Sequence, residues 1–329
     1  MERIKQRFIW LDWMKVIGMY FIICGHLWVP YYLQIYTFSV PAFFIISGFL
    51  HKEYAEGSFL MRTFRNLILP MFILTIPEIL WDISWEIKNG TFERSFLLSR
   101  ISNILLGYEG FDRYGGGLGN LWFVYTLSII KVIVHYTKIT GIRYLLLLIF
   151  LLFSFYLNYI DFDVYNSWIN VFLAYPFYLI GIELSKKSFT LDRGANRFLM
   201  VCLFVICLVA IFLCGKYNGM VLMFNNGYGH SLVLFFIGAI LGTYALYVFC
   251  WFLGSYDLYF IKVLSVGNII TLGLHYIIRI IYQNLPLFSQ PSHWGYLCAF
   301  ITLITFIPII IMSKRYFPFL LGRSRVNNL

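Results

Sequence analysis

The sequence predicts an all-α integral membrane protein, built as a bundle of about ten transmembrane helices. Of the 329 residues, 60% are hydrophobic and only 12% are charged, whereas soluble domains carry about 25% charged residues. The apolar residues are also gathered in runs of about 20, the length at which a helix crosses a hydrocarbon core about 30 Å thick. These observations exclude a soluble protein, and the net charge of +10 is therefore read as membrane orientation, with no nucleic-acid partner expected.

The apolar runs between polar breaks define ten candidate spans. Backbone groups in lipid must be hydrogen-bonded within their own segment, so each run is expected to be a helix. The first run is too long and too polar for a cleaved signal peptide. The whole chain, 1–329, is expected to be one membrane-embedded domain without an appended soluble domain. The spans lie near residues 8–28, 34–51, 66–85, 120–137, 143–160, 168–184, 198–215, 231–253, 263–284 and 294–313.

The distribution of Lys and Arg predicts the orientation. With the N-terminus in the cytoplasm and ten spans, seventeen basic residues fall in cytoplasmic segments and five in outer segments. This is a strong positive-inside bias, and an odd number of spans would destroy it. Both termini are therefore expected in the cytoplasm. The five outer residues are Lys88, Arg94, Arg100, Arg113 and Lys216.

The six cysteines lie within or at the edges of apolar runs, and none forms a CxxC pair. We interpret them as small buried hydrophobic residues and expect neither a disulfide framework nor a metal site.

The longest outer loop is expected at about 86–119 and ends in "GYEGFDRYGGGLGN". Glycine-rich backbone with carboxylates and aromatic rings such as Tyr114 suits contact with a polar ligand such as a sugar. A plain connecting loop explains the same residues equally well.

The first span carries three ionisable residues, Asp12, Lys15 and His26. Lys15 and His26 are eleven positions apart, which places them on one helix face, about 16 Å apart along the axis. Asp12 is in range to pair with Lys15. Asp12 and Lys15 also suit a role as interfacial anchors. His26 is either a structural histidine bonded to a neighbouring helix or a general base, for which its reference pKa near 6.5 is suitable.

Other spans also carry polar residues. In the ninth run, His275 and Arg279 are one turn apart, and Asn268 lies two turns earlier. A buried arginine in a span implies an anionic partner or a water-filled cavity. Together these residues predict a polar cavity within the bundle. Further polar or amphipathic residues in apolar runs are Ser47, Glu78, Asp82 and Trp122.

Six stretches resemble, in order, the acyltransferase-3 family of bacterial membrane acyltransferases. They are "LDWMKVIGMYFIICGHLW", "PAFFIISGFL", "RTFRNLILP", "LWFVYTL", "YPFYLIGIEL" and "SVGNIITLGLHYII". The resemblance covers about residues 9–280. It implies a ten-helix domain in the bacterial cytoplasmic membrane that moves an acyl group, usually acetyl from cytoplasmic acetyl-CoA, onto hydroxyls of cell-surface or exported carbohydrates.

The resemblance also implies which residues form the site. The family's pattern of a basic residue and a histidine eleven positions later falls on Lys15 and His26, where the family usually has arginine first. Its FFxxSG pattern falls on "FFIISG", which contains Ser47. The basic pair before the third span falls on Arg62 and Arg65, and the late histidine on His275. Some relatives carry an extra esterase-like domain after the last helix. Because no such domain is expected here, the protein is expected to act alone or with a separate periplasmic or extracellular transferase partner.

These readings combine into one hypothesis. Arg62 and Arg65 attract the phosphates of coenzyme A, and His26 takes the proton of a sugar hydroxyl as that hydroxyl attacks the thioester. Asp12 and Lys15 orient the first helix or touch the donor. Donors to the oxyanion are expected among Ser47, Asn268 and Trp122. Residues expected to contact the acceptor are Trp122, Asn268, Arg279 and Tyr114, and His275 is expected to take part in catalysis.

Two other classes remain open on sequence grounds. A transporter or flippase of a lipid-linked sugar also needs buried charges and many helices, and it predicts translocation without dependence on acetyl-CoA. A glycan polymerase is the other rival, with the 86–119 loop as its candidate outer loop.

Overall fold

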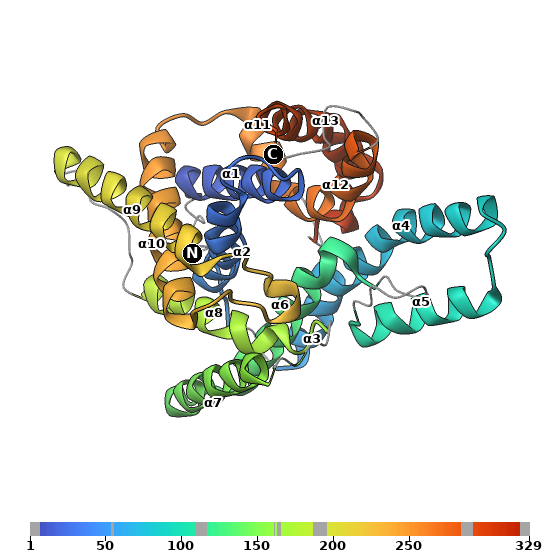
Figure 1. The fold of residues 1–329 in the computed structure, drawn as a ribbon, viewed down its shortest axis with the longest axis horizontal. Helices are drawn as coiled ribbons and strands as arrows, with labels where there is room; N and C mark the ends of the chain where they lie inside the picture. The colour runs from blue at the N-terminus through green and yellow to red at the C-terminus, as the bar shows by residue number, and fades with distance from the viewer. Residues whose placement is uncertain are drawn as a thin grey trace.

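A computed structural model describes residues 7–53, 56–108, 117–160, 162, 166–186, 196–283 and 292–322. This part of the chain is helical (Figure 1), and its only extended pairings are two isolated β-bridges. The helices are α1 (Ile9–His26), α2 (Tyr32–Phe49), α3 (Glu56–Thr63), α4 (Leu69–Lys88), α5 (Arg94–Leu106), α6 (Trp122–Tyr136), α7 (Thr140–Tyr159), α8 (Asn170–Lys186), α9 (Arg197–Asn218), α10 (Leu232–Leu253), α11 (Tyr259–Val266), α12 (Asn268–Gln283) and α13 (Trp294–Tyr316). Shorter turns are the π-helical segment η1 (Phe64–Ile68) and the 3-10 turns η2 (Gly119–Leu121), η3 (Met223–Asn225) and η5 (Pro318–Leu321).

The predicted all-α polytopic architecture is confirmed. Each of the ten predicted runs coincides with a helix or a helix pair. By length and composition, six of the described helices can cross a membrane, or seven if the bent pair α11–α12 counts as one span. Helices α6 and α8 have only 15 and 17 residues, shorter than the roughly 20 that a full crossing needs. The count of ten spans therefore stays a prediction.

Helix α2 lies near the centre of the bundle, between α1 and α8 (Figure 1). It packs most extensively on α8, then on α10 and α1. The α2–α8 crossing is close because Gly48 and Gly181 face each other's backbone: a Cβ on Gly48 would overlap the carbonyl of Tyr178, and one on Gly181 would overlap that of Ile45. Small residues at such crossings let membrane helices approach closely.

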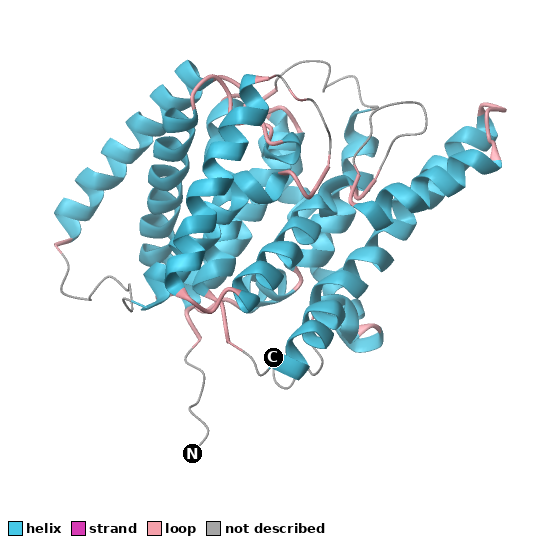
Figure 2. Cartoon of the chain, turned by 90° about the horizontal axis from the view of Figure 1, so that it is seen from below, coloured by secondary structure: helices cyan, strands magenta, loops and turns pink. Residues whose placement is uncertain are grey.

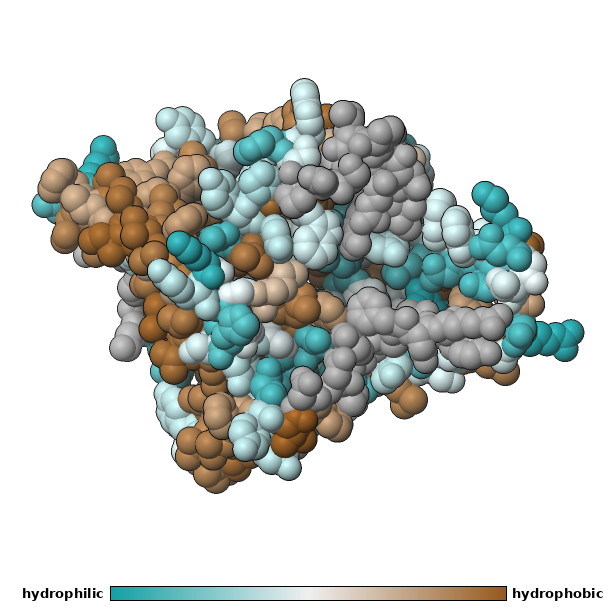
Figure 3. Space-filling model, viewed as in Figure 1, coloured by the Kyte–Doolittle hydropathy of each residue, from teal (hydrophilic) through white to brown (hydrophobic). Residues whose placement is uncertain are grey.

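Helices α7 and α9 lie at the periphery and present apolar side chains outward (Figures 1 and 3). Phe198 and Ile206 of α9 are 77% and 61% exposed, and Leu152 of α7 is 61% exposed. Such a surface is unfavourable in water but matches the hydrocarbon of a bilayer. The burial pattern therefore agrees with a membrane location.

The two ends of the described chain lie at one end of the bundle, the lower one in Figure 2. Arg7 forms an ion pair with Asp257, just before α11. Tyr259, at the start of α11, lines a small cavity together with Lys314 and Arg315 at the end of α13. The prediction that both termini are on the same side of the membrane agrees with this arrangement.

The predicted loop over 86–119 is wrong for much of its length. Helix α4 continues to Lys88, and α5 occupies 94–106. The two helices form a hairpin that extends away from the bundle (Figures 1 and 2). Tyr114, with the rest of 109–116, lies outside the described residues.

All six cysteines are free thiols, four of them buried and two, Cys202 and Cys298, partly buried. The interpretation of the cysteines as buried residues is confirmed for Cys24, Cys207, Cys214 and Cys250.

Candidate functional site

A cavity of about 230 Å³ lies among α1, α2, α6, α11 and α12. Helix α1 contributes one face to it, because Lys15, Met19, Ile22 and His26 recur at helical spacing and all line it. The predicted shared face of Lys15 and His26 is thus correct. Five of the residues proposed from the sequence line this one cavity: Lys15, His26, Ser47, Trp122 and Asn268.

His275 adjoins this cavity beside His26. Its ring is 1% exposed, and its centroid lies 5.2 Å from that of His26. The Nδ1 of His275 is 3.0 Å from the carbonyl oxygen of Thr271, and its Nε2 is 3.3 Å from Nδ2 of Asn120. Because the carbonyl only accepts, Nδ1–H donates to it, and Nε2 accepts from the amide of Asn120. These two bonds fix the orientation and tautomer of the second histidine.

The cavity also meets a break between two helices. Helices α11 and α12 are bent by 76° at Gly267, and Ser265 and Asn268, on either side of the break, both line the cavity. A Cβ on Gly267 would collide with Ile310 of α13, so glycine is required where the break packs. Broken helices in membrane proteins are tolerated where they line a cavity. The positive end of the α12 dipole lies at this cavity.

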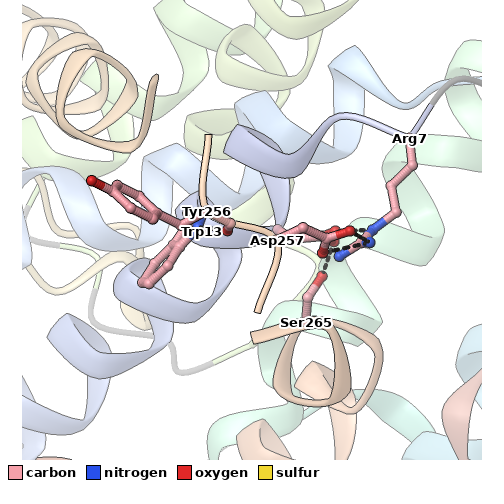
Figure 4. Close-up of polar contacts among 6 residues, drawn as sticks. Arg7, Trp13, Tyr256, Asp257 and Ser265 are labelled. Atoms are coloured by element: carbon pink, nitrogen blue, oxygen red, sulfur yellow. Dashed lines mark hydrogen bonds and ion pairs between the residues drawn. The ribbon is translucent and has the colours of Figure 1, made fainter. Parts of the chain in front are cut away.

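A charged network anchors the start of α1 (Figure 4). Asp12 accepts from Arg7 Nε at 2.6 Å and from the Ser265 hydroxyl at 2.5 Å. The same guanidinium binds Asp257 at 2.9 and 3.0 Å. Because Ser265 lines the cavity, the network ties one cavity wall to the beginning of the first helix.

This network gives Asp12 a partner that the sequence analysis did not name. Asp12 forms an ion pair with Arg7, five residues earlier, and its predicted pairing with Lys15 stays a prediction. Asp12 is absent from the residues that line the described cavity and reaches that wall through the Ser265 hydroxyl. The position of Asp12 therefore fits an anchor rather than a group that touches substrate.

A second cavity, of about 280 Å³, lies at the end of the bundle where the described chain begins and ends. Two cationic side chains line it, Arg62 from α3 and Lys131 from α6, and Leu321 and Gly322 form part of its wall. We call this space the basic cavity. Leu67 and Ile269 line both it and the cavity of His26. Leu67 belongs to the π-helical segment, a local distortion often found at functional sites.

His51 lies in the turn after α2, within reach of the charge of Lys131. The Nδ1 of His51 is 2.9 Å from the hydroxyl of Tyr178 in α8. Burial, together with the charges of Lys131 and Arg143, lowers the pKa of His51 to about 4. One of these two cations, Lys131, also lines the basic cavity.

Several predicted residues lie elsewhere. Arg65 is exposed and lines neither cavity in the described part of the chain. Glu78 and Asp82 form ion pairs with Arg100 of α5 and are absent from the described lining of both cavities. Arg279 belongs to α12, but its side chain, like all of Tyr114, is outside what the structure describes.

Sequence reasoning missed three site residues: Lys131, Asn120 and Ser265. Lys131 had a usable signal, because it is an isolated cation inside the apolar run 120–137. Asn120 immediately precedes "LWFVYTL", where only Trp122 was selected. Ser265 carries no local signal, since its place follows from the break at Gly267.

Comparison with known proteins gives one match. A family model described as an acyltransferase domain matches residues 8–313. No curated protein and no solved structure matches the chain. The matched range includes every residue that lines the cavity of His26 and all of the basic cavity except Leu321 and Gly322.

Proposed function

The chain belongs to the acyltransferase-3 family and is a multi-pass membrane acyltransferase, and on that premise we propose that it transfers an acetyl group from cytoplasmic acetyl-CoA to a hydroxyl of a cell-surface or exported carbohydrate. The observation that carries the proposal is the pairing of two cavities through a common wall. One contains the histidine that suits base catalysis, and the other contains two cations at the opposite end of α1.

The basic cavity suits the nucleotide end of the donor. Arg62 and Lys131 offer charge-assisted hydrogen bonds to phosphate oxygens. The cavity lies beside the chain ends, on the side that the Lys and Arg distribution assigns to the cytoplasm. The apolar wall of Leu67 and Ile269 leads from there to the cavity of His26, so an extended pantetheine arm reaches the histidine from the phosphate site.

The cavity of His26 supplies the chemistry of acyl transfer. His26 accepts the proton of the acceptor hydroxyl while the hydroxyl oxygen forms a bond to the thioester carbonyl carbon. The carbon–sulfur bond then breaks, and the proton passes from His26 to the leaving thiolate, giving an ester and free coenzyme A. Lys15, on the same helix face, lies between the histidine and the cytoplasmic end, where it contacts the donor.

Charge on the tetrahedral intermediate needs donors fixed in advance. Ser47 and Asn268 line the cavity, and Asn268 begins α12. The positive end of that helix dipole therefore favours a developing oxyanion at this point. His275, held by Thr271 and Asn120 beside His26, keeps the imidazole environment fixed.

The acceptor approaches from the opposite side. His26 is the last residue of α1, about 26 Å along the helix axis from its first residue. We assign the acceptor to the periplasmic or extracellular side of a bacterial cytoplasmic membrane, with membrane lipid around the bundle. Trp122 provides a flat apolar face for a sugar ring, and Arg279 and Tyr114 remain proposed acceptor contacts.

Isotope transfer tests the function. Membranes containing the protein are supplied with acetyl-labelled acetyl-CoA on the cytoplasmic side, and label is measured in the glycan fraction with and without the gene. We expect gene-dependent, alkali-labile label in glycan. Translocation of a lipid-linked sugar without any acetyl transfer would overturn the proposal in favour of a flippase.

A further inference from the structure

We propose that Glu78, paired with Arg100, positions the histidine pair of the cavity through Gly119 and Asn120. The inference rests on the proposed role of the histidines in acyl transfer. It gives a function to a charge cluster that lines neither cavity in the described part of the chain, and it makes Glu78 a positioning residue rather than a catalytic one.

Arg100 lies against two carboxylates, so the charges around it do not balance. This side chain is 1% exposed and donates from Nη2 to Asp82 at 2.7 Å and to Glu78 at 3.2 Å. Asp82 makes the shorter contact and alone balances the guanidinium. Glu78 is the more buried carboxylate, 14% exposed against 30% for Asp82. A second acidic group inside a membrane protein is costly, so its presence calls for a further contact.

That further contact is with the turn before α6. Gly119 has φ +52°, and a Cβ there would lie 2.5 and 2.8 Å from the two carboxylate oxygens of Glu78. The backbone of Gly119 therefore lies directly against the carboxylate. Gly119 begins η2, which continues into α6. A carboxylate at the N-terminal end of a helix is favoured by the helix dipole, so Glu78 holds this turn by charge as well as by contact.

The η2 turn also holds His275. Asn120, the residue after Gly119, lines the cavity and donates from Nδ2 to Nε2 of His275. The His275 ring lies beside the ring of His26, with a tilt of 41° between them. Contacts therefore run from Arg100 and Glu78 on the α4–α5 hairpin, through two consecutive residues of η2, to the imidazoles. A shift of the turn changes the position of the Asn120 amide and with it the orientation of His275.

The experiment compares two carboxamide variants that each remove one negative charge from the same guanidinium. Glu78→Gln and Asp82→Asn are purified in nanodiscs, and kcat and the KM for acetyl-CoA are measured. A merely structural ion pair predicts the larger defect for Asp82→Asn, which loses the shorter contact. Positioning predicts the reverse: kcat falls about tenfold or more in Glu78→Gln, with little change in KM, and stays within about twofold in Asp82→Asn.

A double-mutant cycle tests the route through the turn. If Glu78 acts through Asn120, the kcat of Glu78→Gln combined with Asn120→Ala falls no further than that of the worse single variant. Multiplication of the two single effects would overturn the inference. Glu86→Gln, on the same helix but hydrogen-bonded to Thr91 at the hairpin tip, is the matched control and is expected to behave as wild type.

A second readout does not depend on activity. Carbethoxylation of His275 by diethyl pyrocarbonate, followed by mass spectrometry, reports whether both ring nitrogens remain engaged. We expect slow modification in wild type and in Asp82→Asn, and modification several-fold faster in Glu78→Gln and Asn120→Ala. Equal rates in all four proteins would reject the positioning role. If the wild-type protein transfers no acetyl group, the proposed function is rejected. The rate of His275 modification then still decides whether Glu78 positions His275.

Discussion

An imidazole near the end of a membrane helix needs hydrogen-bond partners that lipid cannot provide. His275 meets this need with the carbonyl of Thr271 and the amide of Asn120. His26 faces a cavity that also contains Ser47 and Asn268. His275 is held by the protein on both nitrogens, and His26 lines the cavity in which the proposed function places the substrate hydroxyl. On that proposal we assign base catalysis to His26.

Replacing His26 by alanine tests that assignment. Loss of a positioned general base costs roughly 10²–10⁴ in rate, so we expect acetyl transfer by His26→Ala to fall by at least about a hundredfold. Insertion and thermal stability should remain close to wild type. The measurement is kcat with labelled acetyl-CoA, alongside a melting curve in nanodiscs.

His230→Ala is the matched control for this variant, because His230 is an exposed histidine outside both cavities. It should retain full activity. A His26→Ala protein that folds and transfers acetyl at the wild-type rate would remove His26 from the chemistry.

Single-helix periodicity was enough to predict part of the site. Contacts between distant segments could not be predicted from the sequence. Lys15 and His26 share a face because of a spacing that can be counted in the sequence. The ion pair of Asp12 with Arg7 could not be counted in this way, because Arg7 lies before the first helix and the fold brings it back to Asp12. The role of Glu78 likewise depends on Arg100, which the sequence placed in a loop.

At the scale of helices, the motif "FFIISG" serves two purposes on adjacent residues. Ser47 lines the cavity of His26, while Gly48 faces the backbone of α8, where any side chain would overlap the carbonyl of Tyr178. Close packing of α2 on α8 therefore sets the position of Ser47. Sequence resemblance identified the motif, but only the packing explains its glycine.

Gly48→Ala is expected to disrupt this crossing. Overpacking a close contact costs about 1–3 kcal/mol, and here the neighbour is backbone that cannot rotate away. We predict a lower melting temperature in nanodiscs and a matching loss of activity.

Gly141→Ala provides the comparison, because Gly141 lies in α7 with no atom within 4 Å of an added Cβ. There alanine should leave stability unchanged or raise it slightly through its higher helix propensity. Equal melting temperatures for Gly48→Ala and wild type would show that the α2–α8 contact is not close in the membrane.

The breaks and bends of helices were the least predictable elements. The run 263–284 reads as one apolar span, yet it bends by 76° at Gly267. At the bend, Gly267 packs against Ile310 of α13, a contact between residues far apart in the sequence that no local pattern indicates. The hairpin helix α5 was missed because its composition is too polar for a span and it contains no long apolar run.

At the scale of the whole molecule, the proposed function requires a donor from one side of the membrane to meet an acceptor from the other. The two cavities meet this requirement because they share the wall of Leu67 and Ile269 while their charged residues lie toward opposite ends of α1. Sequence charge counting predicted which end is cytoplasmic. The family resemblance selected Arg62 and Arg65 together, whereas the structure brings only Arg62 to the basic cavity, beside Lys131.

This separation of Arg62 from Arg65 leads to a test with two acyl donors. Acetyl-CoA carries the nucleotide phosphates, and S-acetylpantetheine carries the same thioester without them. Loss of a hydrogen bond to a charged group costs about 1.5–3 kcal/mol. Arg62→Ala and Lys131→Met should therefore each raise the KM for acetyl-CoA by roughly ten- to a hundredfold, while the KM for S-acetylpantetheine stays unchanged.

Arg65→Ala should affect neither donor strongly, because Arg65 is exposed outside the basic cavity. Added salt should weaken acetyl-CoA binding by wild type more than by the two cavity variants, since part of the attraction is electrostatic. Equal increases in KM for both donors would mean that Arg62 and Lys131 shape the passage rather than bind phosphate. In that case the nucleotide would have to bind elsewhere on the cytoplasmic face, and the common wall of the two cavities would no longer define the path of the donor.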